Sequence, residues 1–368
     1  MAKSLRFRWI LKNWFVLGLI GSIVISLLVP EIGNTMGFGG ITTKVLIIVI
    51  FLITGLTLPS ETILARLGNV KFHIFTQSFI FIFIPLYFAV TAPLLGRIIN
   101  EWTLIGLYGI AVLPTTISSN IVFTQASGGN VVATTFNAAV ANVTGIFISP
   151  LLLSILLKTT GRVMPLEELL NIFKSLLLLM LLPIAMGQIV RGFTHDFLNR
   201  YDMYSRDFIF FPEFLNAKKQ NLPKPITHRN LPFSCDRRLR YGKKLRESTS
   251  VMILLIVFIT ISNAVATGLF DLKGDGLSIA LAYLALSHIL FLAIIFGIAK
   301  MLDFSREDRI SALYTAPQKT LAMGAPLLSI FFADRPELIA ASIVPLSFYH
   351  LWQLIVAGFI RGIFVKKL

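Results

Sequence analysis

Apolar positions along this chain fall into long runs separated by short polar segments. Ten runs of about 20 mostly apolar residues can be read from the sequence, and a helix of that length crosses the hydrocarbon core of a bilayer. The runs cover 14–29, 41–58, 72–95, 104–125, 131–157, 172–190, 250–269, 277–300, 310–332 and 338–365. Only helices and closed barrels satisfy every backbone amide in lipid, so the pattern predicts an all-α membrane protein of about ten transmembrane helices.

A single long polar segment, 191–247, lies between the sixth and the seventh run, and the ten runs form two successive sets of five. The predicted organisation places the first repeat at about 1–158 and the sixth span at 172–190, which together make up 1–190, while 248–368 holds spans seven to ten. Five is an odd number, so two successive halves cross the membrane in opposite directions. The sequence therefore predicts two inverted five-helix repeats.

Prolines with hydroxylated and amide residues interrupt the fourth and the ninth run at corresponding positions. A proline breaks the helical ladder and frees carbonyls and helix ends that can bind ions or anions. We therefore expect broken helices 4 and 9 to cross at mid-membrane and to form the binding site for substrate and ion. The candidates are Pro114, Thr115, Ser118, Ser119 and Asn120 in the first interruption, and Thr315, Pro317, Gln318, Lys319 and Thr320 in the second. Ordinary kinks in packed helices are the alternative interpretation.

Basic residues are distributed unevenly over this arrangement. With the N-terminus in the cytoplasm, the cytoplasmic segments hold 25 Lys and Arg residues and the outer segments hold 7. The positive-inside rule therefore predicts that both termini and the 191–247 segment are cytoplasmic, in a plasma membrane or in a bacterial inner membrane. The basic prelude to the first run also fits a signal peptide, but no small-residue cleavage site stands out, so we expect a retained first span.

Composition narrows the classes of function. Apolar residues make up 55% of the 368 residues, charged residues only 14%, and the mean hydropathy is +0.80, whereas soluble domains carry about 25% charged residues. The net charge of +15 follows the topology, so no nucleic-acid partner is expected. No carboxylate pair falls inside a run, which argues against an enzyme that needs paired acids. A lone cysteine, Cys235, excludes an intramolecular disulfide.

Several short motifs occur in an order that is typical of one transporter family. They are Gly55-Leu56-Thr57-Leu58, the segment 114–120, Gly128-Gly129-Asn130 followed by Phe136-Asn137, Gly187-Gln188-Ile189-Val190-Arg191, and Pro345-Leu346 followed by Tyr349, His350 and Gln353. With these motifs the chain resembles the sodium/bile acid cotransporter family, most closely its member-seven-like branch of animals and bacteria. The resemblance implies a panel domain, a core domain with crossing helices 4 and 9, and alternating access.

The resemblance also implies ligands for a coupling ion. Carried over by position, the candidate sodium ligands are Ser119, Asn120, Thr134 and Gln318. Asn137 is a further candidate on the fifth helix, and His350 belongs to a Tyr-His pair that recurs in this branch. No cofactor other than a coupling Na+ is expected.

Two departures from the family pattern bear on coupling. The glutamate that relatives carry in helix 9 is absent, since Tyr314 or Thr315 stands near its place, and Lys319 replaces an uncharged residue. A lysine at the centre of a span costs about 2.5–3.5 kcal/mol, so Lys319 is expected either to take the part of a bound cation or to satisfy the carbonyls of a broken helix. Coupling to sodium, to protons or to no ion stays open.

Three functions of different classes fit the sequence. The leading one is a secondary transporter of an organic anion, because two helix N-termini and Lys319 would concentrate positive potential around a central cavity. The second is a regulator without transport activity that acts through the basic loop, since animal members of the branch are linked to calcium homeostasis. A channel comes third, because no repeated filter motif or ring of charges is visible.

Overall fold

The structure is a computed structural model that describes residues 14–57, 69–96, 98–158, 165–193, 233–266, 276–333 and 335–365. Every regular element in these ranges is helical. The elements before the long polar segment are α2 (Trp14–Leu28), α3 (Pro30–Gly37), η1 (Phe38–Gly40), α4 (Ile41–Thr57), α6 (Val70–Ser78), η2 (Phe79–Phe83), α7 (Ile84–Thr91), η3 (Ala92–Leu95), α8 (Glu101–Ala111), α9 (Ser118–Ala126), α10 (Val131–Lys158), α11 (Leu166–Leu176), η4 (Leu177–Leu181) and α12 (Leu182–Phe193). Those after it are α14 (Phe233–Ala266), α15 (Leu277–Met301), α16 (Arg306–Thr315), α17 (Leu321–Phe331) and α18 (Pro336–Val365).

Seven helical stretches in the described residues are long and apolar enough to cross a membrane. They correspond to the second, third, fifth, sixth, seventh, eighth and tenth predicted runs. The first run forms α2, a helix of 15 residues. The fourth and ninth runs are each divided into two shorter helices, α8 with α9 and α16 with α17. The chain is therefore a multi-pass membrane protein, all-helical over its described residues.

Two predicted boundaries are wrong. Residues 30–40, left between the first two runs, form α3 and η1, and Pro30 stands at the start of α3, where its missing N–H needs no helical partner. Residues 233–247, assigned to the polar loop, belong to α14, which continues unbroken into the apolar run. Arg, Lys, Leu and Glu favour helix, so the helix extends beyond its apolar part. The rest of the predicted loop, 194–232, lies outside the described residues.

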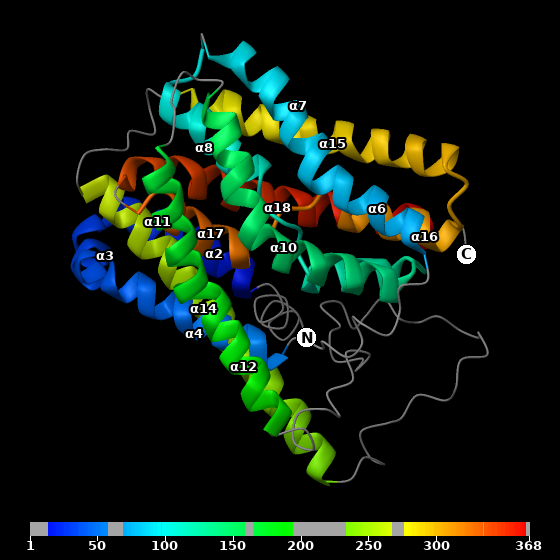
Figure 1. Cartoon of the computed structure of the whole chain (residues 1–368), viewed down its shortest axis with the longest axis horizontal. Coiled ribbons are helices and arrows are strands. Elements are labelled where there is room, and N and C mark those ends of the chain that lie inside the picture. Colours follow the sequence, from blue (N-terminus) through cyan, green and yellow to red (C-terminus); the bar gives the residue numbers. More distant parts are fainter. Residues whose placement is uncertain are drawn as a thin grey trace, which may run out of the picture.

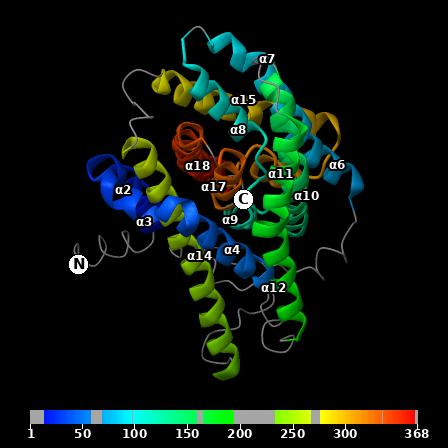
Figure 2. The same ribbon diagram turned by 60° about the vertical axis from the view of Figure 1, so that its left-hand side comes forward.

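The helices pack in two groups. The panel group consists of α2, α3, α4, α12 and α14, in which α12 lies against α4 and α14 lies against α2, α3 and α4. The core group runs from α6 to α10 and from α15 to α18, with α8 against α18, α10 against α9 and α16, and α15 against α16 and α18. Figure 2 shows α4 and α14 on one side of α17 and α15 on the other.

Two glycines let the panel helices α4 and α12 touch. A Cβ on Gly55 would lie 2.3 Å from the backbone oxygen of Ile184, and a Cβ on Gly187 would lie 2.4 Å from that of Leu52. Gln188 Nε2 donates a hydrogen bond to Gly55 O at 2.5 Å. Close backbone approach at small residues is the usual way in which membrane helices pack. The motifs around these glycines therefore hold the panel group together.

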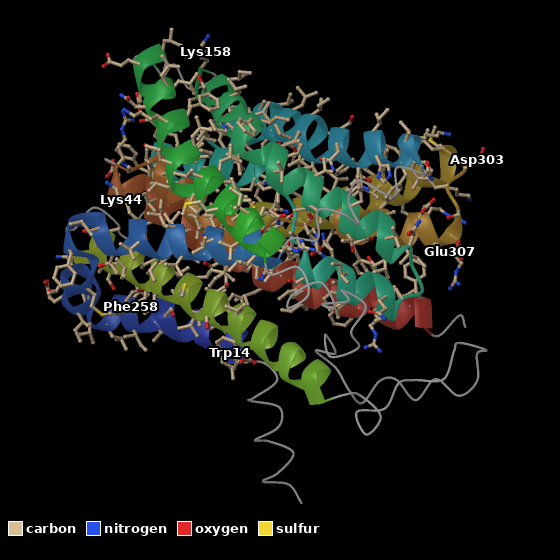
Figure 3. All side chains as sticks on the ribbon, turned by 60° about the horizontal axis from the view of Figure 1, so that its bottom comes forward. Trp14, Lys44, Lys158, Phe258, Asp303 and Glu307 are labelled. Carbon is tan, nitrogen blue, oxygen red and sulfur yellow. The ribbon has the colours of Figure 1, made fainter. Side chains whose placement is uncertain are left out.

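Residues predicted on opposite sides of the membrane lie at opposite ends of the molecule. Lys44, at the predicted outer end of the second run, and Lys158, directly after the fifth run, lie toward one end in Figure 3. Asp303 and Glu307, from the predicted inner segment between the eighth and ninth runs, lie toward the other. In Figure 1, α12 and the beginning of α14 extend past the other helices. The described helices therefore run between two distinct ends, as a membrane-spanning chain requires.

A buried carboxylate ties three helix starts together at the end that holds Glu307. Asp308 Oδ2 accepts a hydrogen bond from Asn69 Nδ2 at 2.9 Å, and Asp308 Oδ1 accepts one from Asn130 Nδ2 at 2.8 Å. Asn69 caps α6, Asn130 directly precedes α10, and Asp308 is in the first turn of α16. The carboxylate therefore holds together the end of the core group at which α6, α10 and α16 begin.

We expect Asp308→Ala to lower the free energy of unfolding by about 2–3 kcal/mol, because two amide donors lose a charged acceptor. Thermal unfolding of the detergent-purified protein measures the change. Glu307→Ala is the matched control, since that side chain is exposed on the same turn. Equal melting temperatures for the two variants would show that the carboxylate does not tie the core together.

Candidate functional site at two crossing helix breaks

The first break separates α8 from α9 at 112–117 and leaves the carbonyl end of α8 without helical partners. Each backbone carbonyl from Ala111 to Thr115 accepts a hydrogen bond from elsewhere in the chain. The donors are Lys319 Nζ to Ala111 O (2.9 Å) and Leu113 O (2.7 Å), Ser149 Oγ to Val112 O (2.7 Å), Thr320 N to Pro114 O (3.0 Å) and Asn142 Nδ2 to Thr115 O (2.8 Å). An unwound segment persists in a membrane only when its polar groups are satisfied in this way.

The second break separates α16 from α17 at 316–320 and is braced by α18. Gln353 Nε2 donates to Lys319 O and Gln353 Oε1 accepts from Lys319 N, both at 2.9 Å. One side chain thus replaces the two backbone partners that a helix would supply. Tyr349 OH donates to Pro317 O at 2.7 Å, so a second residue of α18 holds the same segment.

The two breaks are in direct contact. Thr320 N donates to Pro114 O at 3.0 Å, and Thr115 Oγ1 donates to Thr315 O at 2.6 Å. These four residues are buried, and the second contact joins residues 200 positions apart. The segments 114–120 and 315–320 therefore meet, as the paired interruptions predict, although 118–120 already form the first turn of α9.

Four side-chain oxygens from both breaks converge beside the crossing, and we call them the oxygen cluster. They are Thr116 Oγ1, Ser119 Oγ, Asn120 Oδ1 and Gln318 Oε1. Thr116 Oγ1 lies 2.5 Å from Asn120 Oδ1, 2.7 Å from Ser119 Oγ and 2.9 Å from Gln318 Oε1. Ser119 Oγ lies 3.3 Å from Gln318 Oε1.

The oxygen cluster has more oxygen–oxygen contacts than hydrogens to fill them. Only the hydroxyls of Thr116 and Ser119 supply hydrogens, so at most two of its contacts are hydrogen bonds at one time. The Asn120 side chain presents its oxygen to the cluster, because its Nδ2 faces away and donates to Thr115 Oγ1 at 2.9 Å. Thr115 Oγ1 must accept there, since it donates its own hydrogen to Thr315 O. Neutral oxygens crowded in this way are suited to hold a monovalent cation such as Na+.

The oxygen cluster is buried on one side and accessible on the other. Asn120 and Gln318 are 0% and 1% exposed, whereas Ser119 is half-buried and Ser118 is exposed. Ile117, the residue before α9, provides no side-chain cap. The positive end of the α9 dipole therefore lies at the accessible side of the cluster, where it favours an anion.

Lys319 lies in the second break, but its side chain reaches the end of α8. It is 1% exposed, and its Nζ donates to Ala111 O and Leu113 O. Backbone carbonyls at a helix C-terminus carry partial negative charge, so an ammonium in this position interacts favourably with the negative end of the α8 dipole.

Nearly the whole chain matches one protein family. Residues 13–366 match the sequence profile of the SBF-like CPA transporter family. The chain belongs to this family. Its relatives include the sodium/bile acid cotransporter 7 of Xenopus tropicalis, 30% identical over 356 residues that cover 94% of this chain and 90% of the relative. The sodium/bile acid cotransporter 7 of Danio rerio is 29% identical over 353 residues, 94% and 92% of the two chains. An uncharacterized protein of Pseudomonas aeruginosa is 25% identical over 359 residues, 97% and 94%.

Two candidate ligands on α10 of this SBF-like transporter contact groups outside the oxygen cluster. Thr134 Oγ1 lies 3.1 Å from Thr124 Oγ1 and 3.4 Å from Thr315 Oγ1, in a separate group of hydroxyls. Asn137 Nδ2 lies 2.8 Å from His73 Nδ1, so Asn137 faces α6. The structure thus divides the set of sodium candidates: three residues converge, and the two on α10 do not join them.

His350 lies where the core group meets the panel group. Its Nδ1 is 3.0 Å from Gln353 Nε2, which donates to it, and its ring stands edge-on to Phe15 of α2 with centroids 6.2 Å apart. The imidazole thus touches the bracing side chain of the second break rather than the oxygen cluster.

Several residues that build the site were not predicted as site residues. Thr116 is within the first interruption, yet only its neighbours were selected. Asn142 and Ser149 are seven residues apart on α10, a spacing that places both on one face of a helix, and both donate to carbonyls of the first break. Polar residues at this spacing in an otherwise apolar helix were a signal that the sequence offered.

Proposed function

We propose that this protein is a secondary transporter that carries an organic anion across a membrane by alternating access. The contact between two broken helices carries the proposal, because discontinuous helices paired in this way are the usual binding sites of such transporters. The names of the relatives, sodium/bile acid cotransporters, agree with an organic anion as substrate and with sodium as the coupling ion.

The proposed architecture is ten spans in two inverted repeats, with the crossing at mid-membrane. Helix contacts support it in matched pairs. The second span lies against the sixth (α4 and α12), as the seventh lies against the first (α14 and α2). The fifth lies against the ninth (α10 and α16), as the tenth lies against the fourth (α18 and α8). A repeat that turns spans one to five into spans six to ten requires such exchanges.

The oxygen cluster is the proposed sodium site, with Ser119, Asn120, Gln318 and Thr116 as ligands. Bound Na+ would fill the contacts that lack a hydrogen, and it would draw the start of α9 and the second break together. An anion would bind at the accessible side, next to the α9 N-terminus and the bound cation. Sodium would thereby raise the affinity for the anion, which is the physical basis of symport.

Uptake into proteoliposomes tests the proposal. The purified chain is reconstituted and supplied with radiolabelled taurocholate or a sulfated steroid, with an inward gradient of Na+ or of choline. We expect uptake above that of empty vesicles, and faster uptake with Na+. If neither anion enters under either gradient, a regulator that acts through the basic loop becomes the better account. Deletion of 207–232, which stops short of α14, tests that alternative.

The single cysteine allows a direct test of the proposed topology. Cys235 belongs to the polar segment that the charge pattern places in the cytoplasm, and the chain has one cysteine. A membrane-impermeant maleimide should therefore label the protein in inside-out vesicles and leave intact cells unlabelled. Labelling from outside the cell would reverse the orientation. Cys235→Ser is the control for specificity.

A further inference from the structure

The end of α8 is built like a cation site made of backbone oxygens. Ala111 O and Leu113 O both accept from the same atom, Lys319 Nζ, at 2.9 and 2.7 Å. Carbonyl oxygens at the end of a half-helix are the groups that coordinate monovalent cations in membrane proteins. Here the position is taken by an ammonium that the chain itself supplies.

The carbonyl end of α16, the other half-helix that ends at the crossing, accepts a hydrogen bond from a different kind of donor. The last carbonyl of α16, Thr315 O, accepts from the hydroxyl of Thr115 at 2.6 Å. That donor is a hydroxyl, whereas the donor at the end of α8 is a lysine amine, which becomes a cation when it is protonated. The two breaks correspond in position, but only one of the two helix ends is given a fixed cation.

Hydrogen bonds to the backbone of Lys319 fix the point from which its side chain extends. Gln353 binds both Lys319 N and Lys319 O at 2.9 Å, so the segment that carries the lysine cannot slide along the crossing. Lys319 is 1% exposed. A long side chain held at its root and buried along its length places the charge with little freedom.

We propose that Lys319 is a covalently tethered cation, seated in a carbonyl site that a free monovalent cation of similar size, NH4+ or K+, would enter if the lysine were removed. The two hydrogen bonds of Lys319 Nζ, to Ala111 O and Leu113 O, define this site. Its role in a cycle rests on the proposed function: one cation stays bound at the end of α8 throughout, and the oxygen cluster takes the only ion that dissociates at the crossing.

The test uses thermal unfolding of the detergent-purified full chain in chloride salts of choline, NH4+ or K+ at equal ionic strength. In choline, Lys319→Ala should melt at least about 5 °C below wild type, because two buried carbonyls and a helix end lose their donor. NH4+ or K+ should restore at least half of that loss. Wild type should respond equally to the three salts.

Lys71→Ala is the matched control. Lys71 Nζ also donates to a backbone carbonyl, Leu302 O at 2.8 Å, but that side chain is exposed and water can replace it. No salt-specific recovery is expected for this variant. Recovery of both variants to the same extent would show a general salt effect and overturn the proposal, as would a Lys319→Ala loss that neither small cation restores.

A second pair of variants decides the question if Lys319→Ala does not fold. Lys319→Arg keeps the charge and Lys319→Met keeps much of the volume without it. Size-exclusion profiles from crude membranes should show a monodisperse Arg variant and an aggregated Met variant. Equal behaviour of the two, whether folded or aggregated, would mean that charge is not what the site requires. None of these measurements depends on transport, so failure of the uptake assay leaves them interpretable.

Discussion

Asn120→Ala should weaken the apparent affinity for sodium by about 10- to 100-fold, or about 1.4–2.8 kcal/mol, and should abolish sodium-driven uptake at low sodium. The side chain contributes Oδ1 to the oxygen cluster, and its Nδ2 bonds Thr115 Oγ1, which in turn donates to Thr315 O. One substitution therefore removes an ion ligand and loosens a contact between the two breaks.

Two readouts measure this effect independently of each other. Taurocholate uptake as a function of sodium concentration gives the apparent affinity in the transport cycle. The rise of the melting temperature with sodium, compared with choline, reports ion binding without a substrate, because a ligand that binds only the folded state stabilises it by an amount that grows with the ratio of its concentration to its Kd. Agreement between the two would show that the sodium ion bound at this site is the one that drives uptake.

Asn137→Ala is the matched control for this substitution. Asn137 is also a buried asparagine, and its Nδ2 makes two contacts, with His73 Nδ1 at 2.8 Å and with Ala133 O at 2.9 Å. Its loss should reduce stability while leaving the sodium dependence of uptake unchanged. Sodium dependence that changes for Asn137→Ala and not for Asn120→Ala would move the ion site to the fifth helix.

Gly106→Ala is expected to lower the free energy of unfolding by about 3 kcal/mol or more, through overpacking against a backbone that cannot yield. A Cβ at Gly106 would lie 2.2 Å from Ala341 O and 2.7 Å from Ala341 C, so α8 and α18 would have to separate. These two helices carry the first break and the braces of the second. The damage should therefore reach the crossing.

Gly297→Ala provides the control for that prediction. Gly297 is an exposed glycine in α15, and a Cβ there would meet nothing within 4 Å. Thermal unfolding should show no loss for this variant, since alanine favours the helix more than glycine does. Equal stability of the two glycine variants would mean that α8 and α18 are less closely packed than the structure describes.

Much of the fold was predictable because a membrane constrains the sequence locally. Hydrocarbon demands about 20 apolar residues in each helix, so the seven continuous spans appeared as runs, and proline showed where the fourth and ninth would break. The same method missed the helical residues 30–40 and 233–247. Hydropathy identifies residues that are apolar enough to lie in lipid. It does not detect the more polar part of a helix that continues beyond the apolar run.

The candidate site was predictable in its location and only partly in its members. Pro114 and Pro317 mark the breaks in the sequence itself, and Gln318 and Asn120 lie in the same segments. Thr134 and Asn137 were chosen by position in a family pattern. Which face of α10 meets the crossing depends on how α6, α9 and α16 pack around it, and that packing places neither of them with the oxygen cluster.

The hydrogen-bond partners of Lys319 could not be predicted from the sequence. By itself the sequence determined that a costly charge lies within a span and needs a partner, because burial penalises an unpaired ammonium wherever it occurs. It left open whether the lysine takes the part of a bound cation or satisfies the carbonyls of a broken helix. Only the tertiary structure decided, by bringing the end of α8 within 2.7 Å of an ammonium 206 residues away. Every residue has a backbone carbonyl, so the residue types in the sequence could not predict which carbonyls would accept a hydrogen bond from the lysine.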